Sequence, residues 1–142
     1  MDSHAYEEYR ALQDSGVKVG KKNVGVRYNA GGESETFVHS TAKNLVAHIA
    51  LLNGYRVDSE VEVSKNRETI GEIDVLVWGH PERLSYAVEL ETSPEDGILK
   101  EKQAKYVDGT AVDDIQLINI SECPMHMIDA AEWLAEQIGV EV

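Results

Sequence analysis

Residues 69–92, TIGEIDVLVWGHPERLSYAVELET, decide the fold that we expect of this chain. Two runs rich in Val, Ile and Leu flank GHPE, whose Gly and Pro are typical of a turn, so the stretch predicts two adjacent antiparallel strands. Each run contains acids, Asp74 in the first and Glu89 and Glu91 in the second. Ionised carboxylates are costly to bury unless they are paired or bind a metal. These three acids are therefore candidates for a functional site.

The neighbouring segments extend this pair into a mixed sheet with helices on its faces. Short turns connect the first three strands, which predicts an antiparallel meander, and a helix precedes the last strand. The expected strands are residues 55–64, 69–78, 84–92 and 115–120. The expected helices are residues 41–53, 95–107 and 125–138. This order of elements predicts an α/β fold.

Local signals predict where the helices begin and which strand faces water. Ser40 or Thr41 is the expected N-cap of the first helix, and Ser93, followed by Pro94, that of the second. In the strand at 55–64, valines alternate with acids, which predicts one solvated face. The acids expected on that face are Asp58, Glu60 and Glu62.

The 142 residues are enough for one domain with its own core. We divide it into an N-terminal extension (1–37), a core (38–121) and a closing helix (122–142). In the extension, the stretch from Ser3 to Gly16 predicts a short helix capped by Ser3, and residues 24–28 predict a strand. A basic cluster in this extension, interpreted as a solvated loop, comprises Lys18, Lys21 and Lys22.

The net charge of −13 limits the functions that this chain can have. A protein this acidic repels phosphate backbones unless positive charge gathers locally or a metal intervenes. A halophilic source is one explanation, because molar salt screens charges beyond about 3 Å. The chain shows no apolar run of about 18 residues and no signal-peptide pattern, so we expect a cytoplasmic protein without a membrane partner.

The spacing of the acids predicts a metal site. Alternation along a strand puts Glu89 and Glu91 on one face, about 7 Å apart, and the right register brings Asp74 to them. Three carboxylates on one face repel one another, and a divalent cation relieves that repulsion. A few hard oxygen ligands suit Mg²⁺ or Mn²⁺. Such an ion lowers the pKa of a bound water and stabilises charge on a phosphate.

GEIDVLVW followed by YAVELET resembles the central motif of the PD-(D/E)XK nuclease superfamily. The resemblance covers roughly residues 38–121 and implies the restriction-endonuclease-like core, α-β-β-β-α-β, with the metal held by Asp74 and Glu89. The helix after the motif often places a Gln and a Tyr near the site in that family, and KEKQAKYV supplies Gln103 and Tyr106.

The chain departs from the family pattern at two places. Glu91 stands at the lysine position of E-x-K, as in the E-x-E restriction enzymes of the superfamily, and the preceding helix has no acid between residues 39 and 52. In other members the lysine has moved to a neighbouring element, for which Lys43 and Lys102 are the candidates. The helix with His39 and Lys43 also resembles nuclease-like proteins of competence and plasmid transfer, which gives both residues a candidate role near the metal.

The resemblance implies a metal-dependent nuclease that acts on DNA, with RNA as the alternative substrate. Glu91 would hold a second ion or orient the attacking water, and Lys43 or Lys102 would stabilise charge on the scissile phosphate. Gln103 belongs to the candidate catalytic set, Tyr106 is a further candidate for nucleic-acid contact, and a homodimer is one expected assembly. Two alternatives stay open: a catalytically inactive nuclease fold that binds protein or nucleic acid, and an acidic adaptor in which Asp74 and Glu89 are merely ion-paired.

Overall fold

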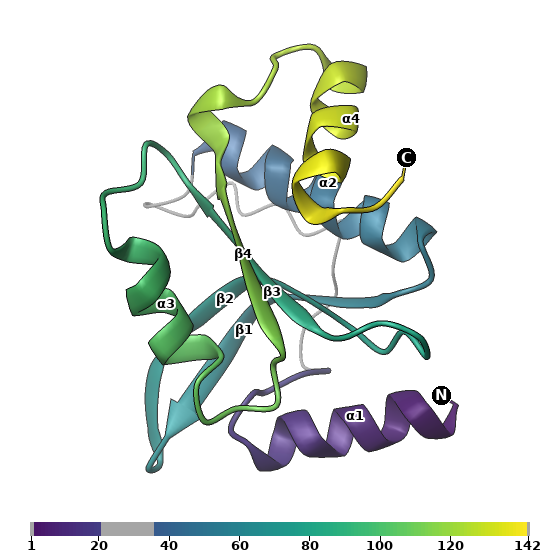
Figure 1. Ribbon diagram of the computed structural model, residues 1–142, viewed down its shortest axis with the longest axis vertical. Coiled ribbons are helices and arrows are strands. Elements are labelled where there is room, and N and C mark those ends of the chain that lie inside the picture. The colour runs from purple at the N-terminus through teal and green to yellow at the C-terminus, as the bar shows by residue number, and fades with distance from the viewer. Residues whose placement is uncertain (1, 21–35, 142) are drawn as a thin grey trace.

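The computed structural model in Figure 1 describes residues 2–20 and 36–141. Its helices are α1 (Ser3–Asp14), α2 (Phe37–Leu52), α3 (Ile98–Tyr106) and α4 (Met127–Ile138), with a short 3-10 helix, η1 (Ile120–Glu122). Its strands are β1 (Arg56–Lys65), β2 (Glu68–Trp78), β3 (Tyr86–Glu91) and β4 (Asp114–Asn119). The residues at 24–28, predicted as a strand, and the lysines at 21 and 22 lie outside the described residues.

The strands of the described part of the chain form one mixed sheet in the order β1-β2-β3-β4. β1 pairs with β2 and β2 with β3 in antiparallel fashion, while β4 runs parallel to β3 after the crossover through α3. This arrangement confirms the predicted α/β class and the antiparallel meander. It also places the two strands that carry the candidate acids side by side.

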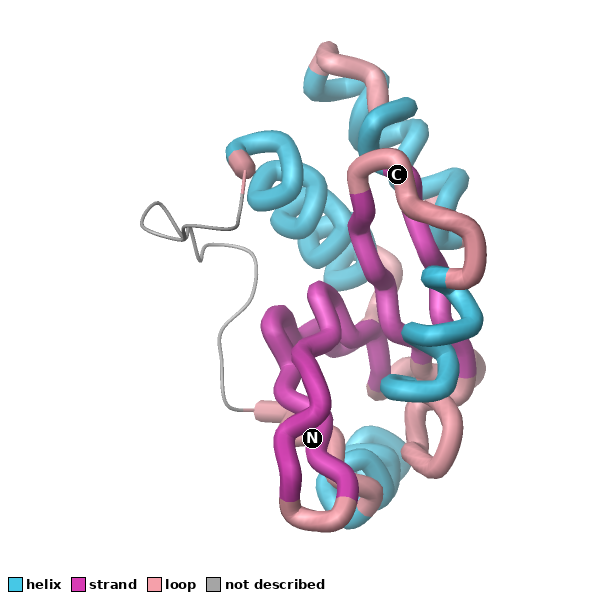
Figure 2. The backbone as a smooth tube through the Cα atoms, turned by 90° about the vertical axis from the view of Figure 1, so that its left-hand side faces the viewer, coloured by secondary structure: helices cyan, strands magenta, loops and turns pink. Residues whose placement is uncertain are grey.

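Helices cover both faces of the sheet because its central strands are apolar on both sides. Val75 and Val77 of β2 pack in a core with α2 and α4, whereas Leu76 packs in a second core with α1 and the end of α3. Figures 1 and 2 show α1 at the opposite end of the sheet from α2 and α4. The N-terminal extension thus contributes a helix to the fold. Among the described residues, no helix is both long and apolar enough to cross a membrane.

The predicted starts of the helices differ from the observed ones by one to four residues. α2 begins at Phe37, because the Thr36 side chain accepts a hydrogen bond from the His39 N–H at 3.1 Å and caps the helix. α3 begins at Ile98, after Gly97 at φ +87°, and not at residue 95. α1 is capped by Asp2, which accepts from the Ala5 N–H at 2.8 Å. α4 begins two residues later than predicted, at Met127.

The expectation that Asp58 is solvated was also wrong. Asp58 is buried in β1, where Oδ2 accepts a hydrogen bond from the Trp78 indole at 2.8 Å and Oδ1 accepts one from the Gly20 N–H at 3.1 Å. Burial, the largest cause, raises the pKa of Asp58, against the lowering effect of these bonds and of the Arg56 charge. Glu60 and Glu62 are partly exposed, and Glu62 pairs with Lys18 at 3.5 Å.

Candidate functional site

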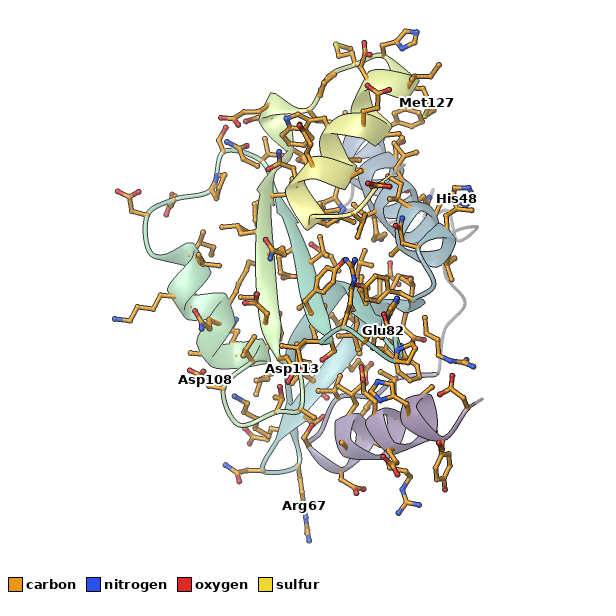
Figure 3. The ribbon with its side chains drawn as sticks, turned by 45° about the vertical axis from the view of Figure 1, so that its right-hand side comes forward. His48, Arg67, Glu82, Asp108, Asp113 and Met127 are labelled. Carbon is orange, nitrogen blue, oxygen red and sulfur yellow. The ribbon has the colours of Figure 1, made fainter. Side chains whose placement is uncertain are left out.

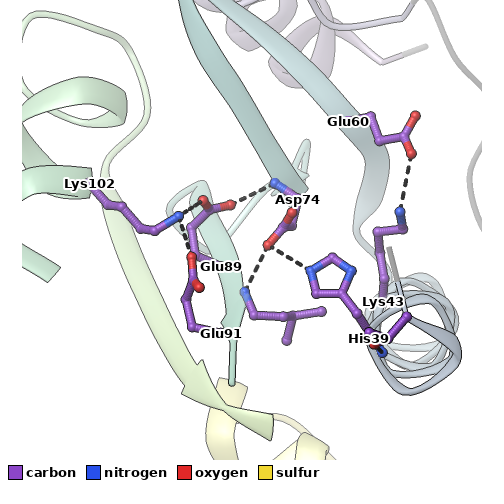
Figure 4. A network of polar contacts seen from close by, with 9 residues as sticks. His39, Lys43, Glu60, Asp74, Glu89, Glu91 and Lys102 are labelled. Atoms are coloured by element: carbon purple, nitrogen blue, oxygen red, sulfur yellow. Dashed lines mark hydrogen bonds and ion pairs between the residues drawn. The ribbon is translucent and has the colours of Figure 1, made fainter. Parts of the chain in front are cut away.

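A polar pocket of about 320 Å³ opens where the N-terminus of α2 meets the ends of the β2–β3 pairing and α3. Its chemically active lining residues are His39, Glu72, Asp74, Glu89, Glu91 and Lys102. The structure therefore brings together the three predicted acids, one of the two candidate lysines and the candidate histidine (Figure 4).

Asp74 and Glu89 tie β2 to β3 at the point where the two strands separate. The backbone pairing ends at Val75 and Val88, so Asp74 and Glu89 are the next residues in register. The Asp74 N–H donates to Glu89 Oε2 at 2.6 Å, and the Leu90 N–H donates to Asp74 Oδ2 at 2.9 Å. Each of the two carboxylates thus accepts a hydrogen bond from a backbone N–H of the neighbouring strand, just beyond the last paired residues, and this bond fixes its position. Both side chains line the same pocket.

Lys102 reaches the pocket from the middle of α3 and bridges the two glutamates. Its Nζ lies 2.7 Å from Glu89 Oε1 and 2.9 Å from Glu91 Oε1 (Figure 4). Charge-assisted bonds of this length are among the strong hydrogen bonds in proteins. One ammonium therefore balances part of the negative charge of this acidic pocket.

Burial and the neighbouring charges shift the acid–base properties of this pair. Desolvation, followed by the charge of Asp74, raises the pKa of Glu89, although Lys102 opposes the shift. Desolvation alone would lower the pKa of Lys102, but the charges and hydrogen bonds of Glu89 and Glu91 outweigh it and raise that pKa. Lys102 is consequently a permanent cation at neutral pH.

His39 joins the site from the first turn of α2. Its Nε2 lies 3.4 Å from Asp74 Oδ2, the oxygen that also accepts the Leu90 N–H. The Thr36 cap fixes the backbone of this turn and so directs the imidazole toward β2. When protonated, His39 forms an ion pair with Asp74; when neutral, it can donate a hydrogen bond to the same oxygen.

The structure does not bring the other three sequence candidates into the pocket lining. Lys43 pairs with Glu60 Oε1 at 3.2 Å, with 4% of its side chain exposed. Gln103 follows Lys102 on α3 and is exposed to solvent, because one helical residue turns a side chain by about 100°. Tyr106 is buried in the α1-side core against Gly71, where its hydroxyl leaves no room for a Cβ.

Sequence reasoning missed Glu72, which lines the pocket. Glu72 and Asp74 form an E-x-D pair on β2, with the same spacing as Glu89 and Glu91 on β3. This alternation was a usable signal, since residues two apart on a strand share a face. Thr36 and Thr92 also line the pocket, but a threonine at an element end gives no comparable signal.

Carboxylate oxygens, the ligands that Mg²⁺ and Mn²⁺ prefer, are the main potential metal ligands of the pocket, beside the imidazole of His39. Within the described ranges, no three His, Cys, Asp or Glu side chains are arranged as a metal-binding group. Lys102 lies at the point shared by Glu89 and Glu91. The site as described is thus an acid–lysine cluster in an open pocket.

No protein-family model matches the chain, and no curated protein or solved structure is significantly similar to it. Its fold and pocket define it as an α/β protein with clustered acids at the end of an antiparallel strand pair.

Proposed function

We propose that the protein is a metal-dependent nuclease that hydrolyses phosphodiester bonds in DNA, in the manner of the E-x-E enzymes of the PD-(D/E)XK superfamily. The observation that carries the proposal is the shared pocket of Asp74, Glu89, Glu91 and the Lys102 ammonium. A lysine from α3 stands beside the E-x-E pair, whereas Lys43 lies in an ion pair with Glu60. Lys102 is therefore the better candidate for the migrated lysine of the motif.

The residues of the pocket fit a divalent cation by donor type. Asp74 and Glu89 would hold the ion and Glu91 would supply a further oxygen. In the described residues, both side-chain contacts of Asp74 use Oδ2, which leaves Oδ1 for a ligand in the pocket. When bound, Mg²⁺ or Mn²⁺ would lower the pKa of a coordinated water and stabilise charge on the phosphate.

The protein's own groups then have distinct tasks. Glu91, at the edge of the pocket, can accept a proton or hydrogen bond from the attacking water. Lys102 can stabilise the negative charge that develops on the scissile phosphate. His39 positions Asp74 through the 3.4 Å contact with Oδ2. Because the net charge is −13, substrate binding depends on local positive charge and on the cation.

A second function, a catalytically inactive nuclease fold that binds protein or nucleic acid, is favoured by one observation. Lys102 already neutralises part of the charge of Glu89 and Glu91, which reduces the repulsion that a metal would otherwise relieve. In such a protein the acid–lysine cluster would serve only to hold α3 against β3.

A cleavage assay with the Asp74→Asn variant tests the first proposal. We would incubate the protein with plasmid, linear and branched DNA and with RNA, in Mg²⁺ or Mn²⁺, at low and at molar salt. We expect Asp74→Asn to lower the cleavage rate by about two orders of magnitude or more, as is typical when a group that stabilises transition-state charge is removed. Mn²⁺ should also raise the melting temperature of the wild type by mass action, and not that of Asp74→Asn.

Asp108→Asn is the matched control, because Asp108 lies on the surface at the end of α3, outside the pocket lining (Figure 3). It should cleave and respond to Mn²⁺ like the wild type. A wild type that cleaves none of these substrates would favour the inactive binding function. Cleavage that survives in Asp74→Asn would overturn the site assignment.

A further inference from the structure

We infer that Lys102 is the resident cation of the pocket and that a divalent cation binds Glu89 only by displacing it. Lys102 would thereby control metal loading. This inference rests on the proposed metal site but makes a separate claim, which concerns competition between two cations for the same oxygens.

Both carboxylate oxygens of Glu89 already have partners. Oε2 accepts the Asp74 N–H at 2.6 Å, and Oε1 contacts Lys102 Nζ at 2.7 Å. The first partner belongs to the backbone of β2 and is fixed by the sheet. The second is the end of a flexible side chain. With only 2% of the Glu89 side chain exposed, an incoming cation gains an oxygen of this residue most readily by replacing Lys102.

Glu91 strengthens the competition. Its Oε1 contacts the same ammonium at 2.9 Å, so Lys102 occupies the position between the two glutamates that a shared cation would take. A divalent ion on these two oxygens would stand at contact distance from Nζ, where like charges repel strongly. The two cations therefore exclude each other.

Lys102 has both the freedom and the space to leave. Its side chain is 15% exposed and lines the open pocket. α3 begins at Ile98, its N-cap Gly97 provides no side-chain hydrogen bond, and Tyr106 is the buried residue of this helix. After displacement, Nζ would be free to contact a phosphate that enters the pocket, because Lys102 belongs to the pocket lining. Metal entry would thus turn Lys102 from a partner of Glu89 into a partner of the substrate.

Mn²⁺ affinity, measured by calorimetry and by electron paramagnetic resonance without substrate, tests this inference on four forms of the full chain. These are the wild type, Lys102→Met, Lys102→Arg and Lys105→Met. Lys105 is on the same helix, is more exposed and pairs with Glu101 at 3.8 Å, so its loss changes net charge equally outside the pocket. Adjacent charges shift ionic equilibria by about one to three powers of ten, so we expect Lys102→Met to bind Mn²⁺ at least about tenfold more tightly. Lys102→Arg and Lys105→Met should stay within about threefold of the wild type, because the first keeps the charge and the second lies beyond direct contact.

A second measurement on the wild type does not depend on how the variants fold. Titration with diamagnetic Mg²⁺ should move the NMR signals of the Lys102 Cε and Nζ groups and leave those of Lys105 in place. Unchanged Lys102 signals in the metal-bound protein, or equal or weaker Mn²⁺ binding by folded Lys102→Met, would overturn the inference. Absence of Mn²⁺ binding in both wild type and Lys102→Met would overturn the inference and the metal site together. If the wild type cleaves no substrate and Lys102→Met still binds Mn²⁺ more tightly, the inference is supported and the proposed nuclease function is rejected.

Discussion

Glu89 and Glu91 share one lysine but differ in their surroundings. Glu89 is buried and tied to the backbone of β2, whereas 35% of the Glu91 side chain is exposed at the end of β3. A buried, anchored carboxylate suits a metal ligand that must not move. An accessible carboxylate at the pocket edge suits a group that exchanges water and protons with solvent. We therefore propose that the two glutamates of the E-x-E pair have different tasks along one strand.

Substitution of Glu91 tests this division. If Glu91 orients water or holds a second ion, Glu91→Gln should lower the cleavage rate in Mn²⁺ by about two orders of magnitude and leave DNA affinity nearly unchanged. Glu91→Lys restores the usual E-x-K pattern and should retain more activity than Glu91→Gln, because an ammonium at this position can stabilise the charge that develops on the phosphate. Glu122→Gln, an exposed change in η1, is the control. Wild-type rates in Glu91→Gln would make Glu91 a simple edge residue.

Asp58 gives a pH-dependent contribution to stability at a position away from the pocket. Burial raises its pKa above the ordinary value for an aspartate, so the folded state holds this proton more tightly than the unfolded chain does. The stabilising contribution is complete below the unfolded pKa and is lost as the pH rises through the folded pKa. Asp58→Asn removes this titration while keeping the acceptor for the Trp78 indole.

We therefore expect the difference in unfolding free energy, wild type minus Asp58→Asn, to fall as the pH rises from about 4 toward 7. Urea unfolding at a series of pH values measures it. The variant also loses the hydrogen bond from the Gly20 N–H, which changes the difference by the same amount at every pH and does not alter its slope. Asp108→Asn, measured in parallel, should not reproduce this slope. A difference that is constant with pH would show that the burial of Asp58 does not perturb its titration.

At the scale of elements, Lys43 links α2 to β1 through Glu60. Both side chains are largely buried, at 4% and 15% exposure, and Glu60 adopts φ +52°, which is unusual for a residue with a side chain. This contact holds the first helix of the core against the strand that neighbours β2. In this ion pair Lys43 makes a structural contact outside the lining of the pocket.

Lys43→Met should lower the unfolding free energy by about 2 kcal/mol, less than for a fully buried pair because Glu60 keeps some contact with water. Chemical denaturation measures this loss. Lys43→Met/Glu60→Gln should recover part of it, since no uncompensated charge remains. Cleavage per folded molecule should match the wild type. A drop in cleavage at unchanged stability would instead return Lys43 to the catalytic site.

The elements show how far the sequence could be interpreted. The strands were predicted well because β-branched runs between turn residues depend on local sequence. The starts of the helices were predicted less well. At α3, for example, the Ser93 N–H donates to Asn119 of β4 and the helix begins only later, and such a bond depends on the tertiary fold. The same limit applies to the site. The alternation of side chains along the strands predicted that the acids share one face of the sheet. Which of the two lysines lies beside them depends on the packing of α3, which places Lys102 there, while Lys43 pairs with Glu60.

For the whole molecule, the dominant property is a net charge of −13 on 142 residues. Self-repulsion at this charge density opposes the compact state, and salt weakens it by shortening the screening length from about 10 Å at 0.1 M to about 3 Å at 1 M. α4 illustrates the effect, because its exposed Glu132 and Glu136 are one helical turn apart and repel each other.

We predict that the unfolding free energy in urea rises with KCl concentration and levels off near molar salt. Urea is the suitable denaturant because it adds no charge, and EDTA removes any effect of divalent ions. Replacing both acids of α4, as in Glu132→Gln/Glu136→Gln, should raise stability at low salt and flatten the dependence on KCl. The exposed amide change Gln137→Asn on the same helix is the control and should leave the KCl dependence unchanged. If the double variant and the wild type depend equally on KCl, repulsion among these charges is not the cause of the dependence. The remaining explanation is the general salting-out of apolar surface.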